Sequence, residues 1–188
     1  MNKRQLGKTN INLNAIGFGG APLGDLFENL EEPNCFQVLE KCYEANINLY
    51  DTSPLYGYGL SEHRLGNFLK TVDEDSYYLS TKVGRYLTPE QESKIDRGRF
   101  AGGLNFTPHL DYSYDGVMRS FEQSLIRLAV SKVDICLIHD VDRFTHGNEV
   151  DHYFKLAMEG AYKALQKLKD EKVIKAIGVG INDSDICA

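Results

Sequence analysis

The chain has 188 residues, of which 42% are hydrophobic and 26% are charged, and it carries a formal net charge of −6 at pH 7. This length suits one domain with one core, and the acidic balance argues against nucleic acid or a membrane surface as the main partner. No apolar run reaches the length of a transmembrane helix, and the N-terminus lacks the apolar core of a signal peptide.

The cysteines and histidines predict neither a disulfide nor a metal site. The cysteines are Cys35, Cys42, Cys136 and Cys187, and none of them forms a CxxC pair. Cys35 and Cys42 lie on one predicted helix, roughly 10 Å apart, which is too far for a disulfide. Cysteines and histidines do not cluster as zinc ligands do. We therefore expect reduced thiols, a cytoplasmic location and no bound metal.

Strand and helix patterns alternate along the chain. A small hairpin is predicted over residues 3–14, turned at residues 7–10. Strands are then predicted at residues 15–20, 47–50, 77–84, 132–140 and 173–180. Helices are predicted at residues 33–45, 61–70, 117–128 and 154–168, with apolar residues at helical spacing. This alternation indicates a parallel sheet with right-handed crossovers.

Two segments between these elements lack a sustained period. Residues 84–112, the lid segment, are rich in aromatic residues, including Phe100 and Phe106. Loops of this length in a compact domain are usually functional or disordered, and the aromatic content favours an ordered lid over a free linker. The lid segment follows the strand that ends near Lys82, so we expect it to contact the substrate. A second loop is predicted over residues 141–151.

Polar residues stand where successive predicted strands end. Asp51, Lys82 and His139 each fall at the carboxyl end of a different strand, and Tyr56 lies on the loop after Asp51. In a parallel sheet these strand ends lie along one edge, which is where α/β enzymes build their sites. Each residue alone has a simpler interpretation, such as a turn cap or a packed side chain. Their convergence on one edge favours a site.

These residue types suit proton transfer to or from a carbon-bound oxygen. A phenol has an ordinary pKa near 10, and a lysine cation beside it favours the phenolate form. Asp51 would pair with Lys82 and hold it charged and in place, and His139 would orient the substrate oxygen. Such a set can protonate a carbonyl while hydride arrives, or deprotonate an alcohol in the reverse direction. The set contains no obvious nucleophile.

Several short motifs resemble one family, the aldo-keto reductases. They occur in the order found in that family and extend across nearly the whole chain. The motifs are GFGG at 17–20, Asp51-Thr52 with Tyr56-Gly57, Ser61-Glu62, Ser80-Thr81-Lys82-Val83, DICLIH at 134–139 and IGVG at 177–180. The subgroup that looks most similar is the aldose 1-dehydrogenases, with L-fucose, D-threo-aldose and L-galactose dehydrogenases and the related pyridoxal 4-dehydrogenase. This likeness lies in the lid segment with residues 111–128, in IHD at 138–140 and in GAYKALQKLK at 160–169.

The resemblance implies an α/β fold, a (β/α)8 TIM barrel that binds NADP or NAD without a Rossmann domain. It implies a catalytic tetrad of Asp51, Tyr56, Lys82 and His139, with Tyr56 as the proton donor. Asp51 and Asn182 would contact the cofactor, and His139 would contact a sugar or aldehyde substrate. Phe106 is expected to contact the same substrate because it lies in the aromatic lid segment after Lys82. Where family members commonly have Gly-Val-Ser-Asn, this chain has Gly-Val-Gly-Ile-Asn at 178–182, so Asn182 is shifted by one position.

Under this interpretation residues 1–188 are a single domain that forms an incomplete barrel. They comprise the N-terminal hairpin and about the first five of eight β/α units, and strands 6–8 are absent. We expect an open sheet edge that promotes self-association, and no dehydrogenase activity from these residues alone. The alternatives are a non-catalytic binding or regulatory protein on the same scaffold, an inactive truncated fragment, and an open doubly wound α/β domain with a hydrolase-like site. The last lacks the G-x-S-x-G motif.

Overall fold

The computed structural model of the chain describes residues 3–184 and 187. Its centre is a parallel sheet of five strands in the order β3-β4-β5-β8-β9. The strands are β3 (Phe18–Gly19), β4 (Leu49–Asp51), β5 (Tyr78–Val83), β8 (Ile135–His139) and β9 (Ala176–Gly180). The predicted parallel sheet is confirmed. Strand β3 is shorter than predicted, because the chain turns after Gly20 into a 3-10 helix that contains Pro22.

The predicted helices also form, with small differences at their ends. They are α1 (Glu32–Glu44), α2 (Leu60–Leu69), α3 (Tyr114–Leu128), and a last run made of α5 (Val150–Leu156), a π-helical turn (Ala157–Ala161) and α6 (Tyr162–Asp170). Pro33 occupies the first turn of α1, as expected. Helix α3 begins earlier than predicted, because the Ser113 hydroxyl caps it by accepting a hydrogen bond from the Gly116 N–H.

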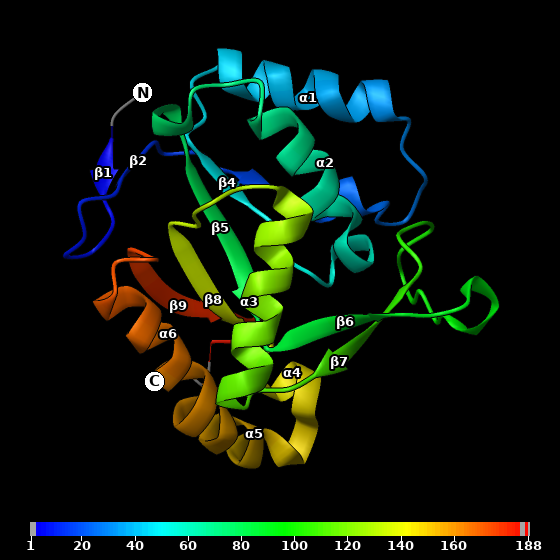
Figure 1. Cartoon of the computed structure of the whole chain (residues 1–188), viewed down its shortest axis with the longest axis vertical. Helices are drawn as coiled ribbons and strands as arrows, with labels where there is room; N and C mark the ends of the chain where they lie inside the picture. The colour runs from blue at the N-terminus through cyan, green and yellow to red at the C-terminus, as the bar shows by residue number, and fades with distance from the viewer. Residues whose placement is uncertain (1–2, 185–186, 188) are drawn as a thin grey trace.

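The helices form one layer on one face of the sheet. Neighbours in the series α1, α2, α3 and α6 pack side by side, and together they bury the outward-facing strand residues such as Tyr50, Leu79 and Ile138 (Figure 1). An open doubly wound sheet carries helices on both faces, so that alternative is wrong. A single outer ring of helices is the arrangement of a (β/α)8 barrel.

The opposite face of the sheet is the inner face of the barrel wall. Its apolar residues, among them Ile135 and Leu137, lie near Ile11 of the N-terminal hairpin. This hairpin pairs β1 (Arg4–Gln5) with β2 (Asn12–Leu13), as predicted. Ile11 is fully buried, so the hairpin covers part of the amino-terminal end of the inner face.

The two predicted loops contain regular structure that the sequence pattern did not show. The lid segment forms an antiparallel hairpin of β6 (Arg85–Pro89) and β7 (Phe106–Leu110), which projects from the sheet as an arm (Figure 1). The loop at 141–151 contains α4 (Arg143–His146), and Asp142 caps this helix by accepting from the Thr145 N–H at 2.9 Å. Both segments were predicted without elements, because such short pieces show no period.

Three further observations bear on the function classes considered. No helix within residues 3–184 has the length and apolarity needed to cross a membrane. In the part of the chain that the structure describes, no group of three or more histidine, cysteine, aspartate or glutamate residues is placed to hold a metal ion. All four cysteines are free thiols, and Cys136 is buried beneath the site described below.

Candidate active site

Strand geometry brings Asp51, Lys82 and His139 to one place. Successive residues of a strand face opposite sides, and all three residues fall in the inward-facing set of their strands. The register staggers them evenly, because Asp51 pairs with Ser80, two residues before Lys82, and Lys82 pairs with Leu137, two residues before His139. The structure therefore places the three side chains on the inner face, at the carboxyl end of the sheet, as predicted from the sequence.

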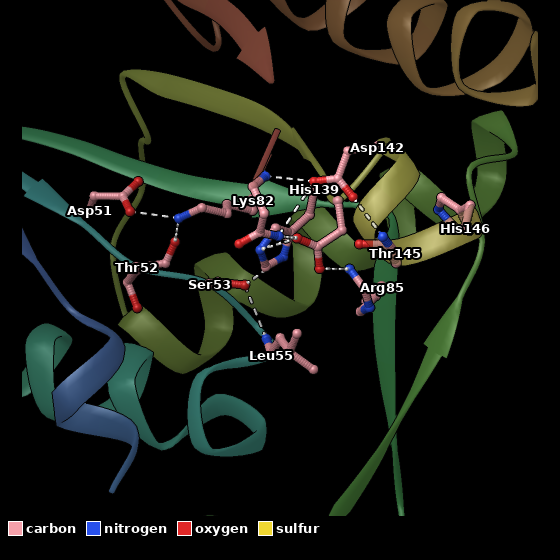
Figure 2. Close-up of polar contacts among 12 residues, drawn as sticks. Asp51, Thr52, Ser53, Leu55, Lys82, Arg85, His139, Asp142, Thr145 and His146 are labelled. Carbon is pink, nitrogen blue, oxygen red and sulfur yellow. Dashed lines mark hydrogen bonds and ion pairs between the residues drawn. The ribbon is translucent and has the colours of Figure 1, made fainter. Parts of the chain in front are cut away.

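Lys82 is held between β4 and β5. Its Nζ lies 2.6 Å from Asp51 Oδ2 and donates to the Thr52 carbonyl at 3.0 Å (Figure 2). The other carboxylate oxygen of Asp51 accepts from the Ser80 hydroxyl at 2.7 Å. A side chain at Gly180 would begin 3.0 Å from Lys82 Cε, so glycine leaves room for the extended lysine. The Lys82 side chain is 6% exposed, and burial with one counter-charge fixes its ammonium in position.

A tight turn presents Tyr56 above this ion pair. Gly57 has φ +61°, and a Cβ at Gly57 would lie 2.5 Å from the Gly24 carbonyl oxygen, so only glycine suits this crossing of two backbones. Lys82 Nζ lies 4.8 Å from the centre of the Tyr56 ring. The rings of Tyr56 and His139 meet edge to face, with centroids 6.0 Å apart. Tyr56 thus lies against both predicted partners.

His139 is a buried, neutral imidazole. Its Nδ1 lies 3.1 Å from the Ser53 hydroxyl, and its Nε2 lies 3.5 Å from Asp140 Oδ1. Burial holds the pKa of His139 well below its ordinary value, and the positive charges of Arg85 and Lys82 lower it further. His139 can therefore exchange hydrogen bonds with a substrate oxygen without carrying a charge at neutral pH.

Asp140 directly follows His139, the last residue of β8, in an unusual backbone conformation. Its φ is +53°, a left-handed geometry that aspartate tolerates better than most residues. Burial raises the pKa of the Asp140 carboxyl, and this effect is opposed by Arg85, whose Nη1 lies 2.9 Å from Asp140 Oδ2. The pair places one carboxylate beside His139 and satisfies its charge from β6.

A cavity of about 410 Å³ opens over Tyr56 and His139. It is lined by Ala21, Leu26, Leu55, Tyr56, Arg99, Phe100, His139, Asp140, Phe144, Thr145 and Asn182. Among the residues that the structure describes, Phe106 does not line it, and Phe100 of the same lid segment does. Asp51 instead lines a neighbouring cavity of about 460 Å³ on the inner face of the sheet.

Asn182 reaches the cavity from the segment after β9. Its backbone N–H donates to Asp142 Oδ2 at 2.6 Å, and its amide Nδ2 donates to Asp140 Oδ1 at 3.3 Å. Its side-chain carbonyl oxygen has no partner among residues 3–184. The shift of Asn182 by one position therefore still leaves this amide beside His139, in the same cavity as Tyr56.

Sequence reasoning missed residues that support the site through contacts to the strand ends. Glu62 is fully buried on α2, where it accepts from the Thr81 hydroxyl at 2.8 Å and from Arg127 Nε at 2.6 Å. The Glu62 carboxylate therefore links α2 to Arg127 of α3 and to Thr81, the residue before Lys82. Ser61-Glu62 was noted as a motif, but only tertiary structure reveals its partners. Ser53, Asp140 and Arg85 were also missed, although Ser53 and Asp140 are next to predicted features.

Comparison with known proteins identifies related chains. The family model described as "Aldo/keto reductase family" matches residues 15–187. Pyridoxal 4-dehydrogenase of Microbacterium luteolum is 38% identical over 98% of this chain and 56% of its own length. D-threo-aldose 1-dehydrogenase of a Pseudomonas species is 38% identical over 91% of this chain and 51% of its own length. L-galactose dehydrogenase of Arabidopsis thaliana is 33% identical over 94% of this chain and 47% of its own length.

Solved structures agree with the fold. The holo form of an aldo-keto reductase from Bacillus halodurans superposes with a TM-score of 0.71 at 25% identity, covering 100% of this chain and 52% of that one. A glycerol dehydrogenase from Gluconobacter oxydans has the same fold, with a TM-score of 0.70 at 23% identity over 96% of this chain and 49% of that one. The chain spans about half the length of the curated relatives it matches.

Proposed function

Because this chain belongs to the aldo/keto reductase family, we propose that its site serves NAD(P)-dependent hydride transfer on an aldose or a related aldehyde or alcohol, with Tyr56 as the general acid and base. The observation that carries this proposal is the position of Tyr56. It lies at the cavity with the Lys82 ammonium 4.8 Å from its ring and the His139 ring against its edge. That arrangement supplies proton transfer, charge stabilisation and substrate orientation in one place.

The proton step follows from these neighbours. In the oxidative direction the Tyr56 oxygen takes the proton of the substrate hydroxyl, and in the reductive direction it returns a proton to the carbonyl oxygen. Lys82 stabilises negative charge on the Tyr56 oxygen, and Asp51 keeps Lys82 in place through their 2.6 Å ion pair. His139 contacts the same substrate oxygen and fixes its position against Tyr56.

The residues present fit a nicotinamide cofactor. Asn182 lines the cavity, and its amide oxygen has no hydrogen-bond partner within the described residues, which suits the carboxamide of a nicotinamide. Asp51 is 28% exposed and retains acceptor capacity for a ribose hydroxyl. When bound, the nicotinamide supplies the hydride acceptor. The residues of this chain then hold the substrate oxygen and move its proton.

The cavity lining indicates a small polar substrate. Arg99, Asp140 and Asn182 offer donors and acceptors for hydroxyl groups, and Phe100 offers an apolar face. This mixture suits a polyhydroxylated molecule better than a purely apolar aldehyde. Similar proteins named for their action on D-threo-aldose and L-galactose support an aldose, oxidised at its anomeric carbon. We assign the aromatic contact to Phe100 rather than Phe106.

The test is turnover of aldoses by the natural polypeptide with NAD and with NADP, compared with its Tyr56→Phe variant. This variant should lower kcat by about 10²–10⁴ and leave cofactor affinity nearly unchanged. Tyr58→Phe is a matched control, because Tyr58 is a neighbouring tyrosine whose hydroxyl bonds only the Asp96 carbonyl among the described residues. Near-normal turnover by Tyr56→Phe would refute the assignment. Absence of turnover by the parent protein on any aldose or aldehyde would favour a non-catalytic scaffold.

A further inference from the structure

Each ring nitrogen of His139 lies near a polar side chain. Ser53 Oγ lies 3.1 Å from Nδ1 (Figure 2). Asp140 Oδ1 lies 3.5 Å from Nε2. A neutral imidazole carries its proton on one nitrogen only, and the hydrogen bond at the other nitrogen decides which. The hydrogen-bond partners of Ser53 therefore determine what His139 can offer to a substrate.

The Ser53 hydroxyl can donate one hydrogen bond, and one acceptor lies within its reach among the described residues. Its side chain is fully buried, and its oxygen already accepts the Leu55 N–H at 3.1 Å. A backbone N–H cannot accept a hydrogen bond, so the hydroxyl hydrogen is not used there. Among the described residues the remaining partner is His139 Nδ1. Ser53 thus donates to Nδ1, which must carry a lone pair.

The other side of the ring leads to the same assignment. The Asp140 carboxylate near Nε2 favours an N–H at that nitrogen. Arg85 engages the opposite oxygen of Asp140 at 2.9 Å, and Lys82 of β5 adds a second positive charge near the ring. These cations oppose a second proton on the imidazole. The ring is consequently neutral, with its hydrogen on Nε2.

We propose that Ser53 is a positioning residue that fixes His139 in the Nε2–H tautomer, so that His139 donates a hydrogen bond to the substrate oxygen held by Tyr56. The tautomer is a property of the free protein, and only its use in turnover rests on the proposed function. The opposite tautomer would direct a lone pair at the lone pairs of the substrate oxygen, which is repulsive. The Ser53 hydroxyl at Nδ1 and the Asp140 carboxylate near Nε2 therefore favour the same tautomer, the one that lets His139 assist the reaction.

The tautomer is measured on protein labelled with ¹⁵N-histidine, by long-range ¹H–¹⁵N correlation at neutral pH. His139→Asn identifies the His139 signals among those of the five histidines. We expect Nε2 to have the shift of a protonated ring nitrogen and Nδ1 that of an unprotonated one. A proton found on Nδ1 in the parent protein would overturn the proposal; the tautomer is read from the parent protein, and the His139→Asn variant serves only to assign the signals.

Two serine variants then test the role of the hydroxyl. Ser53→Ala removes the donor to Nδ1 while Asp140 still favours Nε2–H, so it should shift the Nδ1 signal away from its hydrogen-bonded position, raise the fraction of Nδ1–H above that of the parent and lower kcat/KM by up to about tenfold; Ser53→Thr should restore the parent pattern. Ser61→Ala is the matched control, because Ser61 is equally buried and bonds the Gly20 carbonyl at 2.7 Å, so it should cost stability without changing the His139 signals.

The outcomes separate this inference from the proposed function. If Ser53→Ala leaves the ring-nitrogen signals and kcat/KM unchanged, Ser53 does not position His139. If the signals change as expected but the parent protein oxidises no aldose or related alcohol, the tautomer assignment stands and the proposed function fails.

Discussion

The buried carboxylate of Glu62 gives a prediction that depends on the fold alone. Glu62 is 0% exposed and binds Arg127, whose side chain is 12% exposed, at 2.6 Å. Removing one partner of a buried ion pair typically costs about 3–5 kcal/mol, because the other charge is left without compensation. Glu62→Gln keeps an acceptor for Thr81, and Arg127 retains slight access to water. We therefore expect a loss near the lower end, about 3 kcal/mol of unfolding free energy.

A double-mutant cycle isolates the pair. Arg127→Met keeps the packing of the side-chain stem and leaves the Glu62 charge unpaired, so it should also cost about 3 kcal/mol or more. Combining Glu62→Gln with Arg127→Met removes both charges, and the combined loss should fall short of the sum by about 2 kcal/mol. Urea unfolding followed by circular dichroism measures each corner. Losses that add to within about 0.5 kcal/mol would show that the ion pair does not couple α2 to α3.

Three further predictions concern the site. Lys82→Met should lower kcat by about 10²-fold with a smaller effect on KM, because Lys82 stabilises charge on Tyr56 rather than binding substrate. Steady-state kinetics measures both constants, and an effect on KM alone would contradict this role. Phe100→Ala should change the ratio of kcat/KM between two aldoses by about tenfold, and Phe106→Ala should change this ratio by less. If both variants give the same ratio, Phe100 has no special role in specificity. The folded-state pKa of His139 lies well below the ordinary value, so its contribution to stability is complete above about pH 6.5 and is lost as pH falls toward the folded pKa. His139→Asn should therefore flatten the acid side of the stability profile, and an unchanged profile would argue against a buried neutral ring.

The position of Asp51, Lys82 and His139 along one edge of the sheet was predictable, because it depends on patterns of residues that are close in the sequence. Apolar runs fixed the strands, and their polar ends located Asp51, Lys82 and His139 along one edge. Strand periodicity was enough to bring them onto one face, because the inward-facing positions alternate from each strand end. Tyr56 followed from the glycine-rich turn beside Asp51. These features need only the residues next to one another in the sequence.

The parts that sequence reasoning missed depend on distant pairing. Strands β6 and β7 are separated by residues 90–105, and each contains a proline, Pro89 and Pro108, which argues against a strand. The hairpin tolerates both prolines because it is a two-stranded ribbon, in which each strand has a partner strand on one side only. The contact between Ser53 and His139 likewise joins residues far apart in the chain. No local pattern encodes it.

The lid hairpin also has a consequence for how new specificities arise on this scaffold. Its base is fixed, because Gln123 of α3 bonds both the N–H and the carbonyl of Leu87, at 2.8 and 2.9 Å. Its tip, residues 90–105, supplies Arg99 and Phe100 to the cavity, whereas Lys82 lies below the base. Replacing the tip would therefore change part of the cavity lining while Asp51, Lys82 and His139 stay on the sheet. A grafted tip must keep the Leu104 N–H, which donates to the Gly57 carbonyl at 2.9 Å, because this bond joins the tip to the turn that carries Tyr56. With that contact kept, exchanging tips between related chains is a direct route to redesigning this site.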